Sequence, residues 1–135
     1  MKISINKNKC KIESFNIVPE EGGFELYMKV KDEDIANKLA DAHWDLSKEI
    51  RKEDGDTDAW WSHLNQAKQY YYEIVSWHDG RKGVAKVERK QAKYHLKEGD
   101  EETALQLLQS IAALEEEYDV QLLTDADKDK IEKLS

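Results

Sequence analysis

The spacing of apolar positions changes near residue 31. Before that point, apolar residues of the segment 24–31 occupy every second position: Phe24, Leu26, Met28 and Val30. Strict alternation of this kind is typical of a half-buried strand. The preceding Pro19–Gly23 has the composition of a turn, and shorter alternating runs lie before it. We therefore predict an N-terminal antiparallel β-meander of two or three strands over about residues 2–31.

From Asp32 onward the apolar residues recur every three or four positions, which indicates helices. Segments that contain glycine interrupt the helical pattern near residues 55, 80 and 99. The predicted helices span about residues 32–54, 58–78, 84–97 and 100–118, with a short tail helix possible over 125–134. In the tail, Thr124 and Asp127 have the spacing of a capping box. The expected fold class is α+β, with the meander packed against a bundle of about four helices in a single domain, residues 1–135.

The segment 58–78 contains half of the aromatic residues of the chain. On a helical wheel its apolar and aromatic arc spans roughly 200°, whereas a helix resting on one layer needs about 100°. We therefore expect this helix to have neighbours on two sides, with Trp60 and Tyr71 in the core. Trp61 and Tyr72 fall at one edge of the arc.

The first predicted helix has a narrow apolar stripe that we expect to face the core: Ile35, Leu39, Ala42, Leu46 and Ile50. Trp44 lies on the opposite side of that helix. Large aromatic residues that a one-sided core does not require are enriched in binding hot spots. Either a second layer of the same domain covers Trp44, Trp61 and Tyr72, or another chain does, which includes a dimer of this protein.

The turn at Gly99-Asp100, followed by Ala104, Leu108 and Ile111, resembles one helical hairpin of a tetratricopeptide repeat. The match covers less than a quarter of the chain, and the sequence has no second copy. Because solenoids of such repeats need about three copies to be stable, we interpret this segment as an ordinary αα-hairpin.

Charge is segregated along the chain. The net charge is −8 and 37% of the residues are charged, so we expect a well-solvated surface that does not bind polyanions indiscriminately. Residues 31–79 carry a formal charge of −6 and residues 98–135 carry −9, whereas residues 80–97 carry +6. A basic helix is therefore set between two acidic regions.

The basic segment has three possible roles. Its cations are Arg81, Lys82, Lys86, Arg89, Lys90, Lys93 and Lys97. They could contact the phosphates of a nucleic acid, contact an acidic partner, or form a solvated face that pairs with the protein's own acids. No Asn, Gln or Ser accompanies the stripe in a position to contact base edges, so nucleic-acid contact would involve the backbone only.

Local signatures of catalysis or metal binding are weak. Residues 54–58 open like a calcium loop, but Ala59 and Asn65 stand where an EF-hand needs Gly and Glu. No two of the four histidines have the i, i+4 spacing of a helical zinc site: His43, His63, His78 and His95. We therefore expect no catalytic residues, no metal, no cofactor and no small-molecule substrate, and we do not expect an enzyme.

We predict a small, acidic, non-enzymatic interaction protein of bacterial or phage type that binds a protein partner or itself. An inhibitor that imitates DNA is one version, with acidic clusters in place of phosphates. The alternative is a nucleic-acid-binding module that uses the basic helix 81–97. The residues predicted to contact the partner are Trp44, Trp61, Tyr72, Glu115, Glu116 and Glu117.

We expect a cytoplasmic location without membrane contact. The chain has a lone Cys10, no signal peptide and no apolar run of about 18 residues.

Overall fold

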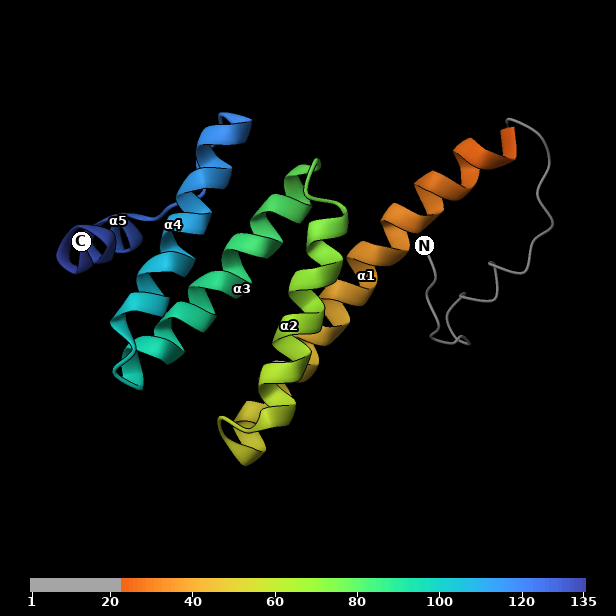
Figure 1. Ribbon diagram of the computed structural model, residues 1–135. Helices are drawn as coiled ribbons and strands as arrows, with labels where there is room; N and C mark the ends of the chain where they lie inside the picture. Colours follow the sequence, from red (N-terminus) through yellow and green to blue (C-terminus); the bar gives the residue numbers. More distant parts are fainter. Residues whose placement is uncertain (1–22) are drawn as a thin grey trace.

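The computed structural model describes the backbone of residues 23–135 and the side chains of residues 33–135. This part of the chain forms five helices: α1 (Gly23–Asp54), α2 (Asp58–Glu73), α3 (His78–Lys97), α4 (Glu101–Tyr118) and α5 (Asp125–Leu134). Each helix packs mainly on the one before it, so that α2 lies between α1 and α3, and α4 follows on the other side of α3 (Figure 1). The prediction of a helical bundle is confirmed.

The α+β prediction is wrong, because α1 begins at Gly23 and includes the segment 24–31 that we expected to be a strand. The described residues contain no strand. The alternation covers only eight residues, and Glu25, Leu26 and Lys29 within it are strong helix formers, so helix propensity outweighs the short strand-like pattern. Extending an existing helix costs less than nucleating a new element, so the helix that follows continues back through this segment. The other predicted strands lie outside the described residues.

The helix ends follow the capping chemistry of the sequence. Thr57 caps α2 by accepting a hydrogen bond from the Trp60 N–H at 3.2 Å. Asp100 caps α4, and Thr124 with Asp127 forms the predicted capping box of α5. Differences occur between α2 and α3: α2 ends at Glu73 instead of about residue 78, and α3 begins at His78 instead of about residue 84.

Two glycines explain why α3 starts early. Gly80 lies inside the first turn of α3, and a Cβ there would approach the Ile74 carbonyl oxygen to 2.0 Å. A Cβ at Gly83 would lie 2.2 Å from the ring of Tyr71. Both glycines therefore allow α3 to pack closely on α2. The sequence pattern suggested a turn at these glycines, but they mark a close helix–helix contact.

The core is centred on α2, as its wide apolar arc predicted. Its members come from α2, α3 and α4 in similar measure, with large side chains contributed mainly by α2. The buried residues at the centre are Trp60, Leu64, Ala67, Tyr71, Val84, Val87, Leu108 and Ile111. Burying each large apolar side chain contributes roughly 1.5–3 kcal/mol.

Helix α1 buries a face that overlaps the predicted stripe only in part, with Leu39 and Ile50 half-buried. Ile35 is buried as expected, but Ala42 is exposed and Leu46 is 46% exposed. The buried positions farther along are Ala36, Ala40 and Ser47. Small side chains at a helix contact permit a short interaxial distance, so α1 can approach the large rings of α2. The Ser47 hydroxyl is satisfied locally because it donates to the Trp44 carbonyl at 2.7 Å.

We expect Gly83→Ala to lower the free energy of unfolding by about 1–3 kcal/mol, because the new methyl group overlaps the Tyr71 ring. A loss of stability would be diagnostic of the close contact, because Ala in a helix is otherwise favoured over Gly by about 1 kcal/mol. Urea denaturation followed by circular dichroism measures the effect. The exposed substitution Gln109→Ala in α4 is the control and should change stability by less than about 0.5 kcal/mol. A Gly83→Ala protein as stable as the parent would contradict the close contact.

Candidate functional site

A groove of about 700 Å³ crosses α3 on the side that faces α1 and the start of α5. Helix α1 lines one wall, the connection between α4 and α5 lines the other, and Gly83 of α3 and Tyr71 of α2 also line the groove. The other lining residues that matter for its chemistry are Asn37, Asp41, Asp79, Lys82, Lys86, Arg89, Leu122 and Thr124. Three helices and one loop therefore converge on a space with both cations and anions.

Four lysines on α3 form a row that begins in the groove and continues beyond it. The row consists of Lys82, Lys86, Lys90 and Lys93, and we call it the lysine row. At 1.5 Å of rise per residue it extends for about 16 Å. No lysine of the row forms an ion pair with another residue of the described chain. Lys86 and Lys90 are half-buried, whereas Lys82 and Lys93 are exposed.

Trp44 of α1 supports the two half-buried lysines. The Lys86 ammonium lies 4.6 Å from the centroid of the Trp44 ring, and the Lys90 ammonium lies 5.6 Å from it. Lys86 is also 5.4 Å from the centroid of the Tyr71 ring. Cation–π contacts of this kind stabilise a partly desolvated ammonium by about 0.5–2 kcal/mol. Trp44 therefore holds both cations between α1 and α3.

The surroundings of these two lysines disfavour their charge. Burial lowers the pKa of Lys86 below its ordinary value, and Lys48 and Lys82 lower it further, although Asp41 and Asp45 act in the opposite direction. Burial also lowers the pKa of Lys90, and Arg51, Lys93 and Lys48 lower it further, against Asp56. An anion placed beside the row would be attracted to cations that have already lost part of their hydration.

The acid nearest the centre of the groove is already engaged. Asp41 accepts a short hydrogen bond from the Tyr71 hydroxyl. Burial, followed by this bond, raises the pKa of Tyr71, so the phenol stays protonated and continues to donate. One oxygen of the Asp41 carboxylate is thereby bound to α2, while its charge still acts on Lys86.

The remaining cations predicted for this surface serve the fold. Arg81 donates to the carbonyl oxygen of Ser76 at 3.0 Å and lies over the Tyr118 ring. Lys97 forms an ion pair with Asp56 at 2.8 Å. Arg89 forms one with Asp127 of α5. The basic stripe expected from the sequence is therefore divided into a set used inside the molecule and the lysine row.

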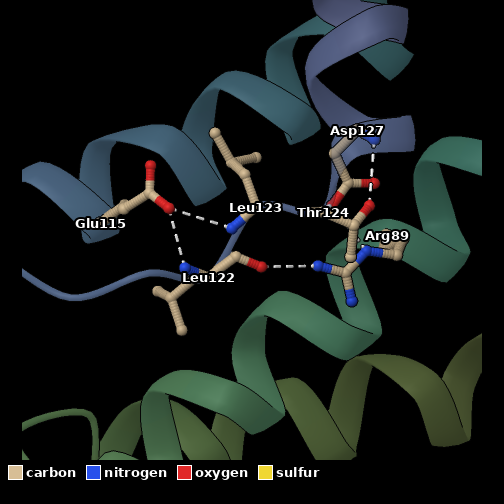
Figure 2. Close-up of polar contacts among 6 residues, drawn as sticks. All are labelled: Arg89, Glu115, Leu122, Leu123, Thr124 and Asp127. Atoms are coloured by element: carbon tan, nitrogen blue, oxygen red, sulfur yellow. Dashed lines mark hydrogen bonds and ion pairs between the residues drawn. The ribbon is translucent and has the colours of Figure 1, made fainter.

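Arg89 connects the groove to the C-terminal helix (Figure 2). Its Nε donates to Asp127 at 2.8 Å, and a terminal guanidinium nitrogen donates to the Leu122 carbonyl at 3.0 Å. The Glu115 carboxylate accepts hydrogen bonds from the N–H groups of Leu122 and Leu123 at 2.8 and 3.1 Å. These contacts fix the connection between α4 and α5 as one wall of the groove.

The structure does not bring the predicted partner residues together. Trp61 and Tyr72 border a second depression of about 650 Å³ along α2, away from Trp44. Glu115 holds the α4–α5 connection, whereas Glu116 and Glu117 are exposed on α4. Only Trp44 lies beside the lysine row.

Two of the four histidines contact each other, and the other two lie elsewhere. His43 of α1 and His63 of α2 place their Nδ1 atoms 2.9 Å apart. His78 is exposed, and His95 lies 3.5 Å from Asp100. Within residues 33–135, no three His, Cys, Asp or Glu side chains are grouped as metal ligands would be. The charged residues that line the groove are Lys82, Lys86 and Arg89, together with Asp41 and Asp79.

Comparison with known proteins gives no assignment: no protein-family model, curated protein or solved structure matches this chain. None of the helices in the described part is long and apolar enough to cross a membrane. Function must therefore be argued from the geometry of the groove.

Sequence reasoning missed the residues that complete the groove, chiefly Asn37, Asp41 and Tyr71. The chain is rich in acidic residues, and nothing in the sequence distinguishes Asp41 from the others. The apolar arc of the second helix predicts only a core position for Tyr71. The two meet across 30 positions of sequence, and no local pattern reports such a contact. The one usable signal was Gly83, a glycine whose missing side chain admits an aromatic ring.

The His43–His63 contact predicts a pH-dependent stability. Burial, followed by the charge of His63, lowers the pKa of His43 from its ordinary 6.5. The folded state therefore binds fewer protons than the unfolded state, and stability is lost as the pH falls below about 6.5 towards the lowered pKa. We expect His43→Gln to flatten the decline in the free energy of unfolding between about pH 7.5 and pH 5, as measured by urea denaturation. His78→Gln, at an exposed site, should retain it, and equal slopes for both variants would refute the explanation.

Proposed function

We propose that this protein is a non-enzymatic interaction module that binds an acidic segment of a partner protein along the groove and the lysine row. The observation that carries the proposal is the state of Lys86 and Lys90. Both are half-buried, rest on Trp44 and have no carboxylate within ion-pair distance among the described residues. A carboxylate of the partner would supply the missing counter-charge and form charge-assisted hydrogen bonds.

A protein segment fits this surface better than a nucleic acid. The lysine row is short, about 16 Å, and acidic regions of the chain with charges of −6 and −9 flank it in sequence. A long polyanion would have to pass near these acids, whereas a short acidic peptide would not. Asn37 and Gln121, which also line the groove, offer amide groups that can hydrogen-bond a peptide backbone.

As part of this proposal, the protein acts in the cytoplasm as an accessory protein of bacterial or phage type. The lone Cys10 suits a reducing compartment, because it allows no disulfide within the chain. Electrostatic attraction at the lysine row would mainly accelerate association and select acidic partners.

A direct test uses a fluorescein-labelled peptide of eight glutamates and fluorescence anisotropy at about 50 mM salt, where exposed charges are weakly screened. We expect the double variant Lys86→Gln/Lys90→Gln to bind about tenfold more weakly than the parent, since two favourable ion pairs are lost. The matched control is Lys52→Gln/Lys133→Gln, which removes the same charge from exposed sites on α1 and α5 and should change affinity less than about twofold.

Two results would overturn the proposal. One is the absence of peptide binding by the parent protein, and the other is an equal loss of affinity in both double variants. A third measurement separates partner classes: an eight-nucleotide oligothymidylate that binds more tightly than the glutamate peptide would assign the surface to nucleic acid. Thermal melts by circular dichroism verify that each variant is folded.

A further inference from the structure

Helix α5 is attached to the rest of the molecule through few contacts. Asp127 is its one buried residue and is 2% exposed, while Ile131 and Leu134 are partly buried. The remaining side chains of α5 are mostly exposed and charged. A helix of ten residues is too short to be stable by itself in water. The docking of α5 therefore depends strongly on the polar contacts at its first turn.

The main cation of that docking contact also lines the groove. Arg89 binds Asp127 of α5 through Nε and the Leu122 carbonyl through a terminal nitrogen (Figure 2). The same Arg89 borders the groove next to Lys86. An arginine side chain binds a carboxylate best in a two-pronged manner, and Asp127 already occupies its Nε.

We infer that α5 is an internal competitor for the groove: Asp127 occupies Arg89, and an acidic partner that binds Arg89 releases α5. This inference rests on the proposed function and adds a regulation to it. When Arg89 turns towards an external carboxylate, the buried Asp127 keeps its capping hydrogen bond from the Thr124 N–H but loses its cation. A buried, unpaired carboxylate is strongly unfavourable, so α5 undocks and Asp127 becomes hydrated. Peptide binding and docking of α5 therefore oppose one another.

The thermodynamic consequence is reciprocal. If docked α5 weakens peptide binding, bound peptide must weaken the docking of α5 by the same factor. Glu115 has a separate role, because it holds the N–H groups of Leu122 and Leu123 and not the side chains of α5. We therefore expect the connection to stay attached to α4 while α5 is released.

The first test compares Asp127→Asn with Asp129→Asn, an exposed position on the same helix with the same change in charge. Asn at residue 127 can still accept the capping hydrogen bond but no longer pairs with Arg89 as an anion. We expect Asp127→Asn to bind the eight-glutamate peptide at least about fivefold more tightly than Asp129→Asn. In an Arg89→Gln background this difference should disappear, because the shared cation is gone.

The second test needs no variant. Hydrogen exchange of the parent protein, with and without saturating glutamate peptide, should show faster exchange of residues 125–134 and unchanged exchange in α4. Equal affinities of the two aspartate variants, or slower exchange of α5 in the presence of peptide, would overturn the inference. Either result, obtained while the parent still binds peptide through Lys86 and Lys90, would leave the proposed function intact.

Discussion

The arrangement of the first three helices depends on the side chain of Tyr71. Its ring packs against the bare backbone of Gly83 on α3, and its hydroxyl donates to Asp41 on α1. One α2 residue therefore sets the separation of α1 and α3. Because the interior is packed as densely as an organic crystal, a change at this point would be transmitted to both neighbours. Tyr71 also lines the groove, at the place where α1 and α3 meet it.

Electrostatics in this protein follow from which helices face each other. The sequence places seven cations within residues 80–97 of an acidic chain, and the fold divides them. Arg81 donates to the nearby Ser76 carbonyl, whereas Arg89 and Lys97 form ion pairs with carboxylates that tertiary contacts bring near. Asp41, which lines the groove, is bound by the Tyr71 hydroxyl. Asp41, Asp45 and Asp56 still attract Lys86 or Lys90, but no described carboxylate forms an ion pair with either lysine.

Polar groups are also used in the interior between α2, α3 and α4. Glu88 is buried, and burial raises the pKa of its carboxyl group, against the attraction of Lys68 at 3.6 Å. Lys68 also donates to Gln91, which in turn donates to Asn65 at 2.8 Å. Such a chain of directional bonds favours one relative position of the helices, since a slip would leave buried polar groups without partners.

The sequence by itself determined where most helices start, the central position of α2 and the segregation of charge, because caps, periodicity and composition act over a few neighbouring residues. The sequence pattern misassigned residues 24–31, where a short alternation competed with strong helix propensity. It also misassigned part of the face that α1 buries, because packing on α2 favoured Ala36 and Ala40 over a stripe of larger residues. Only the tertiary structure decided which cations are paired and that Arg89 meets Asp127. Arg89 and Asp127 are 38 residues apart. The energy of such a contact depends on burial and distance, which no local pattern contains.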